Sequence, residues 1–161
     1  MKSRFTPCLW FNNCAQEAVD YYLSIFKNGK ILSIDYYTDV GEEITGHNKG
    51  DIVTIEFKIN GMKFLALNGG PEFPFNPSVS FTIECRNQKE IDYYWEKLSS
   101  NPSAEQCGWL QDKYGLSWQV VPMVLSKMLL RGTAEQRKKL TEAYMRMKKF
   151  EIEKLERAWR E

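Results

Sequence analysis

One segment pattern occurs twice in the chain, and this duplication constrains the fold more than any single motif. Ala18-Val19-Asp20-Tyr21-Tyr22 reappears 72 residues later as Glu90-Ile91-Asp92-Tyr93-Tyr94. Each copy follows a short β-like run, and each half ends in a hairpin sequence with a glycine turn, at Asn60-Gly61 and Tyr114-Gly115. Because internal repeats decide the architecture of a chain, we expect two related modules in one pseudo-symmetric domain, with a site where the modules meet.

The first module, residues 4–70, predicts the order strand, helix and three strands. Apolar residues recur at helical spacing from Ala15 to Phe26, and Asn12 or Asn13 is expected to cap this helix. Asn60-Gly61 predicts a tight hairpin, since both residues tolerate positive φ. A loop is expected over 39–51. The expected strands are residues 5–11, Lys30–Thr38, Asp51–Ile59 and Met62–Asn68.

The second module, residues 78–122, repeats this order after the proline-rich connection Gly69–Pro77. Asn87 is expected to cap its helix, and Asn101-Pro102 to end it. The expected strands are Ser78–Cys85, 104–106, 108–113 and 116–121.

Residues 123–161 predict a C-terminal helical extension. A short apolar segment, Met123–Leu130, and a break at Gly132-Thr133 precede one long helical stretch, Ala134–Arg160. The pattern leaves open whether this stretch packs on its own domain or pairs two subunits. The 161 residues fit a single domain of the α+β class.

Composition argues against several partners. The 22 basic and 21 acidic residues give a net charge of +1, so neither nucleic acid nor an anionic membrane is expected as a partner. The four cysteines form no CxxC pair, which argues against a zinc knuckle or a redox dithiol. Free thiols without a signal peptide favour a cytoplasmic protein. No apolar run reaches the roughly 18 residues of a membrane-spanning helix.

The chain resembles the PhnB-like (demethylubiquinone methyltransferase-like) family of the vicinal-oxygen-chelate superfamily, which includes glyoxalase I, extradiol dioxygenases and bleomycin-resistance proteins. The resemblance extends from about residue 4 to the end. It implies duplicated βαβββ modules that form a curved mixed sheet around a cleft, and a homodimer. The residues that carry it are Thr6–Phe11, Ala18–Tyr22, Ala66–Phe73, Cys107–Asp112, Tyr114–Pro122 and Met145–Lys149.

The resemblance also implies where a metal would bind in the superfamily's metal-dependent members, on the first and last strands of each module. Carried through the repeat, these positions hold Cys8, Ala66, Ser80 and Val120. This set contains no carboxylate and no imidazole, whereas divalent cations need oxygen or nitrogen ligands. We therefore expect no metal and no cofactor. The only histidine, His47, is expected to be structural or solvent-exposed rather than a ligand.

A methyltransferase would need a site for S-adenosylmethionine. Binding such a cofactor calls for a glycine-rich turn between strand and helix, where the backbone approaches the ligand. The two strand–helix junctions, Asn12-Asn13 and Arg86-Asn87, contain no glycine, and Gly69-Gly70 precedes prolines. The sequence argues against methyl transfer.

Alternation along the strands predicts which side chains face the cleft. Leu9, Phe11, Phe81 and Ile83 are expected to face the helices. The candidate ligand-binding residues are Cys8, Trp10, Phe64, Ser80, Thr82 and Trp118, with Ala66 and Val120 on the same face. Aromatic walls with a few short polar groups suit a small, flat, mostly apolar ligand. The alternative is that these aromatic residues only fill the core. Cys8 is expected to act as a small apolar side chain rather than as a nucleophile.

These observations predict a binding protein that holds a small, largely apolar organic molecule in the cleft between the modules without a metal ion. An alternative is a glyoxalase- or dioxygenase-like enzyme with an atypical site, or a methyltransferase as the family description suggests. A third possibility is a protein-interaction role through the C-terminal extension.

Overall fold

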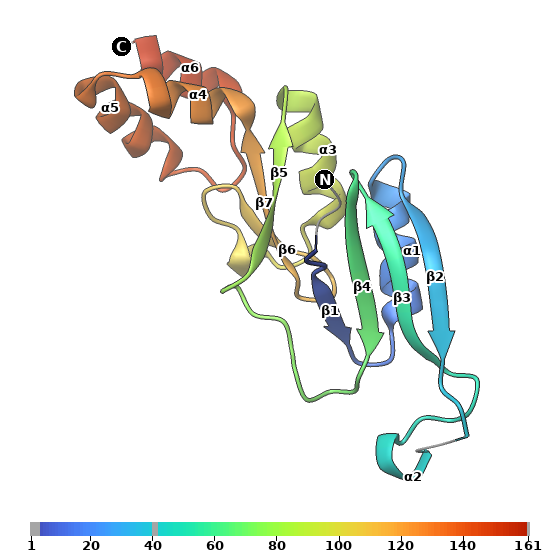
Figure 1. The fold of residues 1–161 in the computed structure, drawn as a ribbon. Coiled ribbons are helices and arrows are strands. Elements are labelled where there is room, and N and C mark those ends of the chain that lie inside the picture. Colours follow the sequence, from blue (N-terminus) through green and yellow to red (C-terminus); the bar gives the residue numbers. More distant parts are fainter. Residues whose placement is uncertain (1–3, 40–41, 161) are drawn as a thin grey trace. The chain divides into compact units, whose positions relative to one another are not determined.

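A computed structural model describes residues 4–39 and 42–160. The chain divides into two compact units, Met1–Pro74 (unit 1) and Phe75–Glu161 (unit 2). Each unit contains its own mixed sheet and its own helices, as Figure 1 shows. The α+β class predicted from the sequence is confirmed. In the described residues no helix has the length and apolar character that crossing a membrane requires.

Unit 1 forms a four-stranded sheet in the order β1-β4-β3-β2. β1 runs parallel to β4, and the other neighbours are antiparallel. A short helix, α2 (Glu42–Thr45), lies within the segment expected to be a loop. The other elements are β1 (Cys8–Phe11), α1 (Ala15–Ile25), β2 (Lys30–Tyr36), β3 (Ile52–Ile59) and β4 (Met62–Asn68).

Helix α1 packs on one face of this sheet (Figure 1). The Tyr22 ring stacks on Phe57 of β3 with 6.4 Å between centroids, and Phe57 stacks on Phe64 of β4 at 5.4 Å. A fully buried side chain of this size contributes about 1.5–3 kcal/mol. All the apolar positions of the predicted helical stripe are buried, namely Ala15, Ala18, Val19, Tyr22, Ile25 and Phe26.

The predicted cap of α1 is wrong. Neither Asn12 nor Asn13 caps the helix; Cys14 occupies the cap position without a side-chain bond. Instead the Ala15 amide donates to Asn68 Oδ1 at 2.9 Å, 53 residues further along the chain. The helix N-terminus is therefore satisfied from the end of β4, which a local sequence pattern could not indicate.

Unit 2 repeats the scheme with one strand fewer. Its sheet has the order β5-β7-β6, with β5 parallel to β7 and β6 antiparallel to β7. β5, β6 and β7 thus correspond to β1, β3 and β4, and Asn87 caps the helix α3 as predicted. The elements are β5 (Ser80–Cys85), α3 (Gln88–Leu98), β6 (Trp109–Gln111) and β7 (Ser117–Pro122).

The strand predicted over 104–106 is wrong. Pro102–Ala104 form a single 3-10 turn, whose first amide is capped because Ser103 N donates to Asn101 Oδ1. Only an isolated bridge between Gln106 and Trp109 remains of the pairing. Proline has a fixed φ and no amide proton, so a turn is favoured here over a ladder.

The long C-terminal helix predicted over Ala134–Arg160 is also wrong. The extension forms α4 (Met123–Arg131), α5 (Ala134–Tyr144) and α6 (Ile152–Arg160). The break between α5 and α6 has a tertiary cause: Cys107 N and Gly108 N donate to Met147 O and Lys148 O at 2.8 and 2.7 Å. Buried apolar residues show that the extension packs within its own unit: Leu140, Met147, Phe150 and Leu155.

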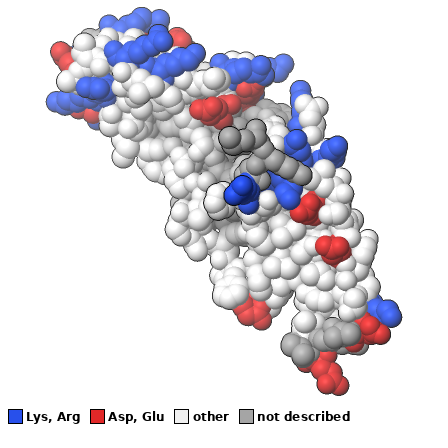
Figure 2. All heavy atoms as spheres, viewed as in Figure 1, with Lys and Arg blue, Asp and Glu red and all other residues white. Residues whose placement is uncertain are grey.

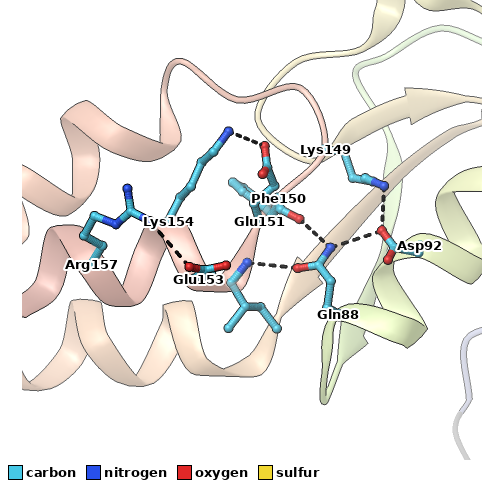
Figure 3. Close-up of polar contacts among 9 residues, drawn as sticks. Gln88, Asp92, Lys149, Phe150, Glu151, Glu153, Lys154 and Arg157 are labelled. Carbon is cyan, nitrogen blue, oxygen red and sulfur yellow. Dashed lines mark hydrogen bonds and ion pairs between the residues drawn. The ribbon is translucent and has the colours of Figure 1, made fainter.

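Gln88 connects the extension to α3 (Figure 3). Its Oε1 accepts from Ile152 N at 2.9 Å, and its Nε2 donates to Phe150 O at 3.1 Å. Beside it, Lys149 Nζ donates to Asp92 Oδ1 at 2.5 Å. One glutamine therefore supplies the first amide of α6 with an acceptor, which explains why the helix begins at this residue.

The nearly balanced charge of the chain is the sum of two unlike regions. Residues 123–161 contain eleven Lys and Arg against six Glu, whereas residues 1–122 contain eleven against fifteen Asp and Glu. On the face seen in Figure 2, Lys and Arg gather over the C-terminal helices. The extension is therefore basic, and the duplicated part is acidic.

Candidate functional site

Strand register decides which side chains of unit 1 lie away from the helix. We call the side of each sheet opposite α1 or α3 its distal face. In the parallel pair β1–β4, Leu9 lies beside Ala66, and Cys8 lies beside Leu65. Paired residues point to the same side of a sheet. Because Phe64 shares the side of Ala66 and stacks on Phe57, the α1 face is the face of Leu9, as predicted.

The predicted facing of Phe64 and Ala66 is therefore wrong. Both are buried on the α1 side, Phe64 with 3% of its surface exposed. Cys8 and Trp10 do lie on the distal face, where their neighbours on β4 are Leu65 and Leu67. The error is a slip of one residue between β1 and β4, since alternation alone does not fix the pairing of two strands.

The same slip affects unit 2. Phe81 pairs with Trp118 and Ile83 with Val120, so all four lie on one side. Glu90 of α3 contributes to the raised pKa of Cys85 on the same side, which identifies it as the α3 face. Trp118, predicted to face the ligand, is instead buried, and its Nε1 donates to Asp112 Oδ2 at 2.8 Å.

Ser80 and Thr82 lie on the distal face of unit 2, as predicted. Ser80 pairs with Ser117, and Thr82 pairs with Gln119. Gln119 Nε2 donates to Ser80 Oγ at 2.9 Å. Ser117 is 1% exposed, and its Oγ has no hydrogen-bond partner within the described part of the chain. This face therefore carries short polar groups, one of them an unsatisfied hydroxyl.

Trp10 is fixed in place on the distal face of unit 1. Its Nε1 donates to Gly70 O at 2.9 Å, and its ring meets Phe73 edge-on with 4.9 Å between centroids. A Cβ on Gly69 would lie 2.2 Å from the indole, so a larger residue there would displace the ring. The glycine pair after β4 thus serves the close approach of a tryptophan.

The register also changes the four positions at which a metal was considered. Ala66 and Val120 belong to the helix faces, and the adjacent distal positions carry Leu65, Leu67, Gln119 and Val121. Leucine and valine offer no ligand atom, and amide oxygens are ligands of hard cations only in larger sets. The prediction of a metal-free site stays a prediction, now on corrected residues.

Two cysteines differ in chemistry from a nucleophile. Cys8 is exposed, yet the burial that it has raises the pKa of its thiol. Burial, and then the charge of Glu90, raise the pKa of Cys85 to about 12. Both side chains are therefore protonated thiols at neutral pH, and a thiolate is the reactive form.

The distal residues that the sequence prediction missed are Leu65, Leu67, Ser117 and Gln119. Their signal was present, since each alternates with a buried neighbour on its strand. It could be used only once the pairing of β1 with β4 and of β5 with β7 was known.

Comparison with known proteins supports this assignment of the fold. The family model described as 3-demethylubiquinone-9 3-methyltransferase matches residues 3–121. A solved structure described as a putative 3-demethylubiquinone-9 3-methyltransferase, PhnB protein, from Bacillus cereus is 31% identical, with a TM-score of 0.61. The alignment covers 74% of this chain and 99% of that chain.

A second solved structure, protein PA1353 from Pseudomonas aeruginosa, has 18% identity and a TM-score of 0.56 and shares the fold. It covers 75% of this chain and 98% of its own. No curated protein matches the chain significantly. The family match ends at residue 121, so it does not extend into the C-terminal extension, where the resemblance was expected to continue. The duplicated part, matched over residues 3–121, places this chain in the PhnB-like family whose model is described as 3-demethylubiquinone-9 3-methyltransferase.

Proposed function

We propose that the protein binds a small, largely apolar organic molecule on the distal faces of its sheets, without a metal ion. The observation that carries this proposal is Trp10, a large aromatic ring held by a hydrogen bond and an edge contact on a sheet face that α1 does not cover. A fixed aromatic ring loses little entropy when a flat ligand stacks on it.

The neighbours of Trp10 extend this apolar surface. Leu65 and Leu67 on β4 are half-buried on the same side, and Cys8 adds a protonated thiol. Together these side chains form an apolar strip along β1 and β4 that suits an aromatic or aliphatic ligand.

Unit 2 contributes polar chemistry on its own distal face. The Ser80–Gln119 pair offers a hydroxyl and an amide, and the buried Ser117 Oγ lacks a partner. A buried hydroxyl without a hydrogen bond is costly, which supports a ligand hydroxyl or carbonyl as its partner. The expected ligand is therefore flat and apolar with one or two polar atoms.

The proposal can be tested with 2-naphthol, a flat probe with one hydroxyl group. Titration into ¹⁵N-labelled protein is expected to shift amide resonances of β1, β4 and β7. Leu65→Ser should weaken binding at least tenfold. Met62→Ser, on the same strand but at the exposed hairpin end, should leave the affinity unchanged. Equal weakening by both variants, or shifts confined to other elements, would contradict the proposal.

Methyl transfer is the second candidate, because the matching family model carries that description. It requires S-adenosylmethionine to bind, so calorimetric titration with this compound decides between the two. Stoichiometric binding would favour the methyltransferase. Titration with ZnCl2 or MnCl2 tests the metal-free part in the same way, and a stoichiometric site on Cys8 or Ser80 would overturn it. A homodimer is proposed from the family resemblance, and light scattering measures it directly.

A further inference from the structure

The two modules carry the same polar pair at the first turn of their helices. Gln16 Nε2 donates to Asp20 Oδ1 at 3.0 Å in α1, and Gln88 Nε2 donates to Asp92 Oδ1 at 3.1 Å in α3. The offset of 72 residues between the pairs is that of the repeat. The two pairs therefore occupy equivalent positions, and what one binds indicates what the other can bind.

In unit 2 this pair binds a lysine and the peptide groups beside it. Lys149 Nζ donates to Asp92 Oδ1, while Gln88 bonds to Phe150 O and Ile152 N (Figure 3). Every bond comes from the C-terminal extension. The Gln–Asp pair thus recognises a primary ammonium group together with neighbouring amide groups.

In unit 1 the equivalent pair borders a hollow of about 850 Å³. We call it the α1 hollow; its walls are the first turns of α1, residues 46–52 and Asn68. Its charged lining residues are Glu17, Asp20 and Asp51, and none of its described lining residues is Lys or Arg. Glu17 stands where the repeat places Lys89 in unit 2, so the first copy is the more acidic.

His47 gives an independent indication of a missing ligand. This residue lines the α1 hollow with only 9% of its surface exposed. Its ring stacks on Tyr37 with centroids 4.4 Å apart and planes at 14°. Its ring nitrogens form no hydrogen bond with any described residue. Buried polar side chains normally have a partner, so an imidazole left without one at the wall of a hollow points to a bound group.

The walls of the α1 hollow are held by hydrogen bonds. Asn68 accepts from Ala15 N and donates to Ile52 O, and Tyr37 donates from its hydroxyl to Asn68 O. Backbone bonds from Tyr37 N to Asp51 O and from Gly50 N to Tyr37 O fix the loop that carries His47. A site built in advance in this way loses little entropy when a ligand binds.

We propose that the α1 hollow binds a primary ammonium group. Asp20 and Asp51 accept hydrogen bonds from the ammonium group, His47 contributes a ring nitrogen as a third acceptor, and the Gln16 amide meets an adjacent carbonyl or amide. Neither Asp20 nor Asp51 forms an ion pair with a described lysine or arginine, so an incoming cation would meet uncompensated charge. This site is separate from the distal faces and does not depend on the function proposed for them.

Two probes distinguish the possible sources of the ammonium group. N-acetyl-lysine methylamide carries an ammonium group with peptide groups, and cadaverine carries ammonium groups alone. Each is titrated into the full chain at low salt while the His47 ring resonances are followed by NMR. Binding of both indicates a small amine as ligand, and binding of the lysine derivative alone indicates a lysine-bearing peptide. Either result supports the site.

Matched variants make the test specific. Asp20→Asn should weaken binding of the lysine derivative at least tenfold. Glu56→Gln should leave it unchanged, because Glu56 is a carboxylate of β3 outside the α1 hollow. N-acetyl-lysine methylamide acetylated at Nζ should not bind. Failure of both amines to shift His47 at millimolar concentration, equal binding of the acetylated probe, or an unchanged affinity in Asp20→Asn would overturn the proposal. None of these outcomes affects the 2-naphthol test.

Discussion

Unit 1 and unit 2 complete their sheets in different ways. In unit 1, β3 pairs along its length with the seven-residue strand β2. In unit 2 the corresponding segment is interrupted by the Pro102–Ala104 turn, and the extension bonds instead to the backbone of Cys107 and Gly108. The duplication therefore sets the pairing scheme, while a single proline-containing turn transfers one edge to a segment outside the repeat.

The copies also differ in register, but in a way that preserves their faces. The first copy pairs Leu9 with Ala66, and the repeat offsets would then pair Phe81 with Val120. Phe81 pairs with Trp118 instead, two residues away. Because side chains alternate with a period of two, a shift of two leaves every residue on its original side. Odd shifts would exchange the core for the surface.

The largest expected effect tests the contact that joins the extension to unit 2. Gly108 has φ +82°, and a Cβ there would lie 2.4 Å from the Phe150 ring and 2.9 Å from Val120 O. Gly108→Ala should cost about 3 kcal/mol in urea unfolding. Gly115→Ala is the matched control, with φ +85° but only Phe75 Cβ nearby at 3.9 Å, and should cost about 1 kcal/mol. Equal costs would show that backbone conformation, and not the Phe150 contact, demands glycine at position 108.

The next effect compares the equivalent glutamines. Gln88→Ala removes the partners of Phe150 O and Ile152 N and should cost about 1–2 kcal/mol. Gln16→Ala removes one exposed bond to Asp20 and should cost about 0.3 kcal/mol. Amide hydrogen exchange should accelerate in α6 in the first variant and stay unchanged in α1 in the second. Unchanged exchange in α6 would mean that its apolar contacts alone hold the extension.

The smallest effect concerns pH. The hydrogen bond from Lys149, followed by that from Gln88, lowers the pKa of Asp92 below its ordinary value. A carboxyl group with a lowered pKa stabilises the folded state above the pKa of the unfolded chain, and this contribution is lost as pH falls through the folded value. Wild type should exceed Asp92→Asn by about 0.5 kcal/mol at neutral pH and low salt.

That difference should shrink below about pH 4, near the ordinary carboxyl pKa. Because the pair is partly exposed, high salt should reduce it as well. A difference that stays constant from neutral to acidic pH would assign the effect to packing and not to the charge of Asp92.

Much of the fold could be predicted because its signals are local. The helical stripe of α1 and the Asn60-Gly61 hairpin follow from spacing and turn chemistry, and Asn60 and Gly61 both have the expected positive φ. The cap of α1 could not be predicted, because its acceptor is Asn68 on a distant strand. For the same reason, nothing near residue 145 indicated that Cys107 and Gly108 would end the helix expected there.

The candidate site shows the same division. Cys8, Trp10, Ser80 and Thr82 were placed on the correct face, because each lies on the strand that opens its module. Phe64 and Trp118 were misplaced, because their facing depends on how β4 and β7 pair with those strands. The α1 hollow was not predicted at all, since it joins α1 to a loop some thirty residues away and its histidine was expected to be structural or exposed.

The amino-acid sequence by itself determined that this protein is built from two copies of one α+β module, because apolar periodicity and glycine turns act over a few residues. Only the tertiary structure decided which faces are buried and what each Gln–Asp pair meets. Register and long-range hydrogen bonds are set by the packing of segments far apart in the chain, and no local pattern encodes them.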